Sequence, residues 1–160
     1  MMPMGSAIPR TRATPVERVI GAFIDGLMMV PVYFVVGMVT GLLAVTLSSS
    51  IIGFVGSAIN ALIAAAWFLM RDALGLSVGK KILGLEVLSA NGGVPTQDQL
   101  KKRNLTLAGG SACGVVPYIG ALASLAVYLY EAFLLFTKGE RYGDQMAGTM
   151  VVKKAATPAA

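Results

Sequence analysis

The stretch Arg18-Val-Ile-Gly-Ala-Phe-Ile-Asp25 opens the longest apolar run of the chain, and no Asp, Glu, Lys or Arg follows it before Arg71. A carboxylate at the centre of a membrane helix costs about 2.5–3.5 kcal/mol, so a partner charge, a bound cation, a proton or a water-filled cavity must offset it. Arg18 precedes Asp25 by close to two helical turns, so both side chains project from one helix face. The pair is therefore the first candidate for a functional site.

The composition is that of a membrane protein. Of the 160 residues, 56% are hydrophobic and 13% are charged, whereas a soluble domain carries about 25% charged residues. The net charge of +5 comes from basic residues at the ends of apolar runs. This distribution favours a bilayer with anionic headgroups, and not nucleic acid, as the partner.

The residue types argue against a metal site, a cofactor and an enzyme. The chain has one cysteine, Cys113, and no histidine. Zinc and haem sites depend on these residues, so neither metal nor cofactor is expected. No Ser–His or Cys–His pair can form, and Gly79-Lys80 does not lie in a phosphate-binding loop pattern, so no catalytic residues are expected.

Two stretches are long and apolar enough to span a hydrocarbon layer of about 30 Å. The first is expected to be one helix at about 15–47, because Thr14 and Glu17 form a capping-box pattern with a proline between them. Pro31 predicts a kink in this helix. The second span is expected at about 51–70, where no charged residue occurs.

The polar segment at 71–97 is expected to form a cytoplasmic loop with a short strand. Apolar residues alternate over 83–87, and the turn signal Asn91-Gly92 follows. A stretch of similar character at about 148–153 can pair with this strand. The sequence therefore predicts a small strand pair beside the membrane.

A kinked helical hairpin is expected at about 98–137, because this segment is too long for one span and glycines and a proline interrupt it near 116–120. Its entering arm is short, so a partly inserted, re-entrant arm is the alternative. Basic residues flank the first span, fill 71–103 and follow the last span, whereas the turn at 48–50 is uncharged. The positive-inside rule then places the N- and C-termini in the cytoplasm and the protein in the cytoplasmic membrane.

The predicted fold is an all-α membrane protein. It is a small polytopic helical bundle of two clear transmembrane helices and a kinked helical hairpin, with a short cytoplasmic strand pair. This membrane domain covers 15–154, between a flexible N-terminal tail at 1–14 and a C-terminal tail at 155–160.

Further polar residues lie in or beside the apolar runs. Glu131 and Asp25 each lie about 9–10 Å from the cytoplasmic ends of their helices, at 1.5 Å per residue, so the two carboxylates can share a level. They either handle an ion or a proton or form a structural hydrogen-bond network. Asn60 is expected to make an interhelical hydrogen bond, with ligand contact as the alternative. The residues expected to face anionic headgroups are Lys101, Lys102 and Arg103.

Four motifs follow one another along the chain: Arg18 with Asp25, Gly79-Lys80-x-x-x-Gly84-Leu85-x-Val87, Arg103-Asn104, and Asp144-x-x-Ala147-Gly148-Thr149-x-Val151-Val152. Their order and spacing, over about residues 15 to 153, resemble the RDD family of small membrane proteins, which is named for one Arg and two Asp. The resemblance implies that Arg18, Asp25 and Asp144 are the signature residues, and it includes Lys80 and Arg103 among the motif positions. It also implies a suspected transport of unidentified ligands.

The chain departs from the family pattern at two places. Family members often carry Gly-Gln-[Ser/Thr] where this chain has Gly75-Leu76-Ser77, and a His where Gly143 stands. The resemblance places Asp144 beside Arg18 at the cytoplasmic face. We therefore expect an Arg18–Asp144 salt bridge, with Arg18 shared between Asp144 and the deeper Asp25 and with Asp25 still in need of a partner.

Three functions remain open from the sequence. The first is transport of a small cation or proton through a site around Asp25, with Glu131 as helper, which requires a homo-oligomer because four short segments can hardly enclose a path. The second is a non-catalytic accessory or assembly subunit of a larger membrane complex. The third is binding of anionic lipid through the basic run at 101–103.

Overall fold

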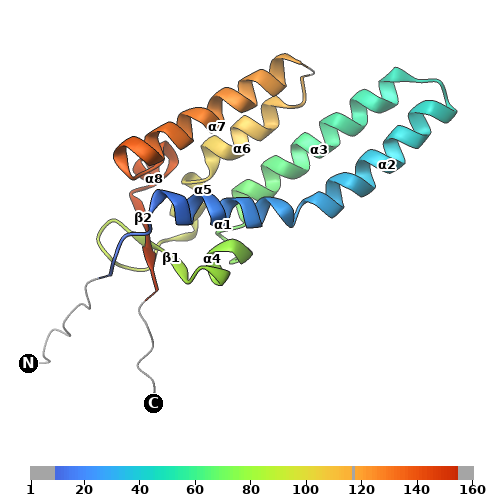
Figure 1. Ribbon diagram of the computed structural model, residues 1–160. Coiled ribbons are helices and arrows are strands. Elements are labelled where there is room, and N and C mark those ends of the chain that lie inside the picture. The colour runs from blue at the N-terminus through green and yellow to red at the C-terminus, as the bar shows by residue number, and fades with distance from the viewer. Residues whose placement is uncertain (1–9, 117, 155–160) are drawn as a thin grey trace, which may run out of the picture.

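The computed structural model describes residues 10–116 and 118–154. Over these residues the chain is mostly helical, with a two-stranded sheet at one end (Figure 1). The elements in chain order are α1 (Pro15–Leu27), α2 (Val30–Thr46), α3 (Ser50–Met70), α4 (Val78–Ile82), β1 (Leu85–Ser89), α5 (Gln97–Lys102), α6 (Leu105–Cys113), α7 (Ile119–Lys138), α8 (Tyr142–Ala147) and β2 (Thr149–Lys153).

The segment expected to be one kinked helix at 15–47 is instead two helices, α1 and α2. The predicted capping box is present, since the Thr14 hydroxyl accepts from the Glu17 N–H and the Glu17 carboxylate accepts from the Thr14 N–H. The break falls between Leu27 and Val30, one turn before Pro31. A proline ring clashes with the carbonyl four residues earlier, which here belongs to Leu27, so α1 ends there.

Three stretches are long and apolar enough to cross a membrane: Pro15–Thr46, Ser50–Met70 and Ile119–Lys138. The first two stretches are the predicted spans, and the third is α7, the returning arm of the predicted hairpin. α2 and α3 form an antiparallel pair in which Gly56 lies directly against the Thr40 side chain. Together with the helical content and the strand pair, these spans agree with the predicted fold class.

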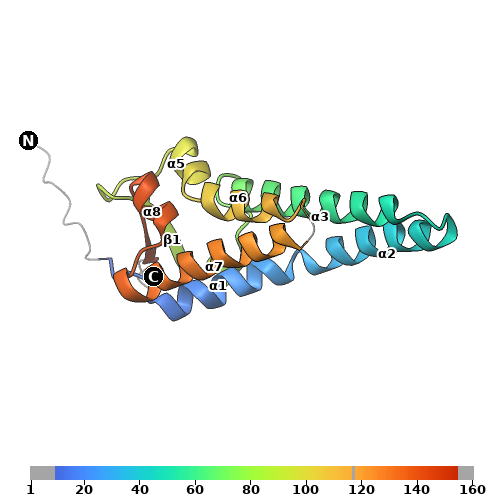
Figure 2. The ribbon, with the colours of Figure 1, turned by 90° about the horizontal axis from the view of Figure 1, so that it is seen from above.

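The α6–α7 hairpin extends less far than the α2–α3 hairpin. α6 has nine residues, about 14 Å at 1.5 Å per residue. At its end, a Cβ on Gly114 would lie 3.4 Å from Cβ of Ala61, which is halfway along α3. Figures 1 and 2 both show this stagger. α6 alone is therefore much shorter than a hydrocarbon layer of about 30 Å.

The predicted strand pair is present. β1 and β2 are antiparallel, with Leu85 opposite Lys153 and Ser89 opposite Thr149. The apolar alternation over 83–87 overlaps β1, and residues 78–82 before it form helix α4. α4 packs on α1, where a Cβ on Gly79 would overlap the carbonyl group of Gly21, so this close contact requires glycine.

The chain near the N-terminus also differs from expectation. Residues 10–14 were assigned to a flexible tail, but the Ala13 N–H donates to the Val151 carbonyl at 3.0 Å and Arg12 pairs with Val152. Ala13 is buried with Leu85 and Val151 in a small core beneath the sheet. The rest of the predicted tails, 1–9 and 155–160, lies outside the described residues.

Candidate functional site

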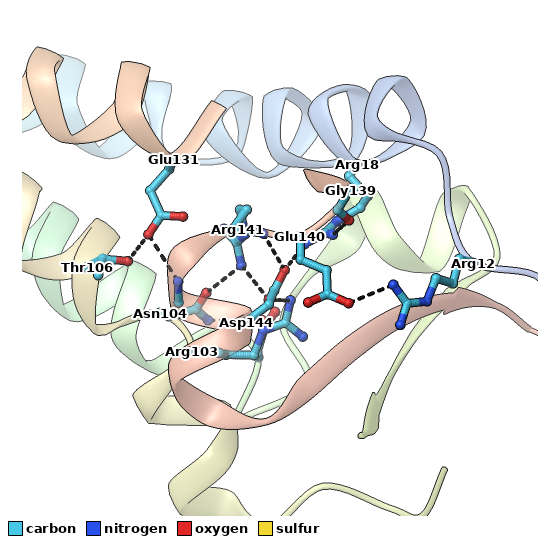
Figure 3. Close-up of polar contacts among 12 residues, drawn as sticks. Arg12, Arg18, Arg103, Asn104, Thr106, Glu131, Gly139, Glu140, Arg141 and Asp144 are labelled. Atoms are coloured by element: carbon cyan, nitrogen blue, oxygen red, sulfur yellow. Dashed lines mark hydrogen bonds and ion pairs between the residues drawn. The ribbon is translucent and has the colours of Figure 1, made fainter. Parts of the chain in front are cut away.

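A cluster of charged side chains is buried where α1, α4, α7 and α8 meet the ends of α3 and α5 and the start of α6. Asp144 is its centre and is fully buried. It pairs with Arg18, with Arg103 (Nη2 to Oδ1, 2.8 Å) and with Arg141 (Nη2 to Oδ1, 3.5 Å), as Figure 3 shows. The predicted Arg18–Asp144 salt bridge is therefore confirmed, and Arg18 also donates to the Gly139 carbonyl at 3.2 Å.

Helix α8 sets the position of Asp144. The Asp144 carboxylate accepts from the Arg141 N–H at 3.4 Å and so caps the first turn of α8. A Cβ on the preceding residue, Gly143, would overlap the carbonyl oxygen of Arg103. Gly143 thus allows α8 to pack closely on the end of α5. A histidine, which the family resemblance suggested for this position, could not fit without a shift of the backbone.

Asp25 has partners, so the expectation that it lacks one is wrong. Its carboxylate accepts from the Ser77 hydroxyl at 2.6 Å and from the Gly79 N–H at 2.8 Å, and it pairs with Arg71 at 3.3 Å. Arg18 is directed to Asp144 and does not reach Asp25 among the ion pairs of the described residues. Asp25 therefore fastens α4 and the end of α3 to α1.

Asp72 is a third buried carboxylate. It pairs with Lys80, accepts from the Asn104 amide at 2.9 Å and lies 3.6 Å from Arg103 Nε. Burial alone would raise the pKa of Asp72, but the nearby charges of Lys80, Arg103 and Arg71 hold it below its usual value. Burial lowers the pKa of Lys80 to about 7, although Asp72 opposes this shift.

Glu131 is the fourth carboxylate, and only one of its oxygens is engaged. Oε1 accepts from the Thr106 hydroxyl and from the Gly143 N–H, the latter at 3.3 Å (Figure 3). Oε2 is buried and has no hydrogen-bond partner among the described residues. Glu131 thus links α7 to α6 and α8 while keeping one acceptor atom free.

A cavity of about 240 Å³ adjoins this cluster. Five basic side chains line it, against two carboxylates, those of Asp25 and Glu131. Several guanidinium nitrogens of these residues are buried without a hydrogen-bond acceptor in the described part of the chain, among them Arg71 Nε, Arg103 Nη1 and Arg141 Nε. The basic residues of the lining are Arg18, Arg71, Lys80, Arg103 and Arg141.

The structure differs from two further predictions, those for Arg103 and for Asn60. Arg103 does not face headgroups; it is almost fully buried on Asp144 and Asp72, because α8 folds back over it. Its neighbours Lys101 and Lys102 remain at least partly exposed, as expected. The side-chain oxygen of Asn60 accepts no hydrogen bond among the described residues, so it does not form the predicted interhelical hydrogen bond there.

Sequence reasoning missed three members of the cluster. Arg71 and Asp72 follow α3 directly and were assigned to a polar loop, and Arg141 was counted only as a cytoplasmic charge. The sequence did contain a signal for this cluster, because acidic residues occur among the basic residues at the ends of the helices. Buried charges must be paired, so alternating signs at converging helix ends indicate a network.

Comparison with known proteins addresses the family but not the ligand. The profile of the RDD family matches residues 12–148, which is most of the chain. No curated protein and no solved structure matches it. The matched segment contains all the members of the charge cluster. The chain therefore belongs to the RDD family.

Proposed function

We propose that this membrane protein binds a small anionic group in the cavity beside the charge cluster. The observation that carries the proposal is the surplus of basic side chains there, five against two carboxylates, with buried guanidinium nitrogens that have no hydrogen-bond acceptor among the described residues. Even with Asp72 and Asp144 included, five basic groups face four acidic ones. An anion would supply the missing acceptors.

The geometry supports anion binding better than a cation site around Asp25. Both Asp25 oxygens accept hydrogen bonds from the protein, and Arg71 lies 3.3 Å from one of them. A cation at Asp25 would have to displace these donors and approach a guanidinium group. Asp25 is better suited to hold α1 and α4 together.

The test is ligand-dependent stability of the purified protein in a non-ionic detergent. Phosphate is compared with chloride at equal ionic strength. A ligand at ten times its dissociation constant stabilises the folded state by about 1.4 kcal/mol. Ala132→Phe, which would fill the cavity from α7, should abolish the phosphate effect, whereas Ala121→Phe on the exposed start of α7 should retain it. Equal stability in phosphate and chloride would refute the proposal.

Proton or cation handling is the second candidate, and one observation favours it. Glu131 lines the same cavity, and its Oε2 is buried with no hydrogen-bond partner in the described part of the chain. Intramembrane carboxylates are functional candidates by default. Cation or proton flux into proteoliposomes, compared between the wild type and Glu131→Gln, tests this role. Equal flux would exclude Glu131 as the titrating group.

The accessory-subunit alternative and homo-oligomer formation concern the outer faces of the helices. No residue of α2 is buried within the described chain, and a Cβ on Gly37 or Gly41 would meet no other atom within 4 Å. A second copy or another subunit could pack there. Purification in mild detergent followed by mass measurement tests both, since a lone monomer with no partner would argue against them.

A further inference from the structure

We propose that the ligand of this cavity is an anionic amphiphile of the bilayer. Its phosphate or carboxylate head would bind the basic side chains, and its apolar chain would lie over Phe68 and Tyr128 in a second, deeper cavity. This inference rests on the anion-binding function proposed above and adds the apolar part of the ligand.

The first cavity has both charged and apolar lining residues. Four of its five basic groups come from the ends of α3 and α5, from α4 and from the start of α8, and the fifth, Arg18, belongs to α1. The apolar lining includes Val19 and Ala22 from α1 and Ala132 and Leu135 from α7. Val19 and Ala22 are also exposed. Since α1 and α7 belong to stretches that are long and apolar enough to cross a membrane, these exposed apolar residues would face lipid.

A second cavity of about 340 Å³ lies deeper in the bundle. It is bounded by the α1–α2 junction, the middle of α3 and the α6–α7 hairpin. No charged side chain lines it, and its walls are small or apolar. They include Gly26, Met29, Ala61, Ala64, Trp67 and Gly114.

Phe68 and Tyr128 line both cavities, so the two spaces meet at these rings. Their centroids are 6.1 Å apart and their planes are tilted by 46°. The Arg71 guanidinium lies 5.0 Å from the Phe68 centroid. The Tyr128 hydroxyl is hydrogen-bonded to Ser111 at 2.5 Å. The aromatic pair therefore separates a cationic compartment from an uncharged one within a few ångströms.

This arrangement fits a ligand with two unlike ends. A free anion would use the basic groups and leave the deeper cavity empty, whereas a purely apolar ligand would leave the guanidinium nitrogens without acceptors. Basic pockets between transmembrane helices near the cytoplasmic side bind lipid headgroups. An amphiphile could enter between α1 and α7 without leaving the bilayer.

The test compares three probes on the purified protein in a non-ionic detergent. They are inorganic phosphate, dioctanoyl phosphatidylglycerol and dioctanoyl phosphatidylcholine, each titrated against thermal stability. We expect phosphatidylglycerol to bind at least tenfold tighter than either phosphate or phosphatidylcholine. Ala64→Phe, which fills the deeper cavity, should reduce phosphatidylglycerol affinity at least tenfold and leave phosphate affinity unchanged. Ala66→Phe, on the exposed side of α3, should change neither.

The outcomes separate this inference from the function on which it rests. If phosphate binds as tightly as phosphatidylglycerol, the amphiphile is refuted and anion binding stands. If phosphatidylcholine binds equally well, or if Ala64→Phe folds and retains full phosphatidylglycerol affinity, the amphiphile is likewise refuted. If neither anionic probe binds, both proposals fall.

Discussion

The protein should unfold at a lower temperature when Asp144, the carboxylate at the centre of the charge cluster, is neutralised. Asp144→Asn keeps the size of the side chain but removes the charge that Arg18, Arg103 and Arg141 share. Their side chains are only 7%, 0% and 12% exposed, so water cannot replace the lost partner. Removing one partner of a buried ion pair costs about 3–5 kcal/mol. For a chain of this size, each kcal/mol lowers Tm by about 2–4 °C.

The assay is thermal unfolding in detergent with a matched control and a double-mutant cycle. The control Glu140→Gln breaks the 2.6 Å ion pair between Glu140 and Arg12. The Glu140 side chain is 30% exposed and the Arg12 side chain is 62% exposed. Such exposed pairs contribute about 0.2–1 kcal/mol, so the control should lie close to the wild type. The double variant Arg18→Gln/Asp144→Asn should lose less stability than the sum of the losses of the two single variants, with a coupling energy of about 0.5–3 kcal/mol.

Two results would refute this reasoning. The first is an Asp144→Asn protein that melts within the range of the Glu140→Gln control. The second is strict additivity of Arg18→Gln and Asp144→Asn, because residues that share a buried ion pair should couple. Either result would mean that the arginines around Asp144 find other partners or water.

Three further predictions concern packing, pH and topology. Gly79→Ala should destabilise the protein by about 1–3 kcal/mol because its Cβ would overlap the Gly21 backbone, whereas Gly26→Ala, with no atom within 4 Å, should melt at or above the wild-type temperature. Lys80 is buried among Asp72, Arg103 and Arg71, and its pKa in the folded protein is about 7. Above that pH the folded state binds fewer protons than the unfolded state, so the stability of the wild type should rise relative to Lys80→Met from about pH 7 toward pH 10. Lys81→Met, at an exposed site, should leave the pH profile unchanged. In a Cys113→Ala background, an impermeant maleimide should label Ser50→Cys in intact cells and Lys102→Cys only after permeabilisation, and the reverse pattern would overturn cytoplasmic termini.

Local signals predicted the elements that depend on local physics. The Thr14 capping box and the turn after β1 are both present, because each needs only a few neighbouring residues. The pairing of β1 with β2 followed from their similar apolar character. Helix α8 was missed, because a six-residue helix is too short to show a period.

The pairing of the buried charges could not be predicted in the same way. Helical spacing placed Arg18 and Asp25 on one face, but in the folded protein Arg18 pairs with Asp144 and Asp25 pairs with Arg71. Arg103 reads as part of a basic surface run with Lys101 and Lys102 until α8 covers it. With five basic groups and four carboxylates, the sequence allows many pairings, and only the packing of the helix ends selects one.

The cluster is difficult to explain as a device for stability alone. Buried ion pairs often contribute less to stability than apolar side chains of similar volume, because the charges must leave water. A purely structural network would also be expected to satisfy its members, yet Arg71 Nε, Arg103 Nη1 and Glu131 Oε2 are buried without partners among the described residues. Asp25 and Asp144 each hold helices together and have both carboxylate oxygens engaged, whereas Arg71, Arg103 and Glu131 line the cavity with atoms that are not. On the function proposed above, the two aspartates would do the structural work, and the cavity-lining arginines and Glu131 would remain for the ligand.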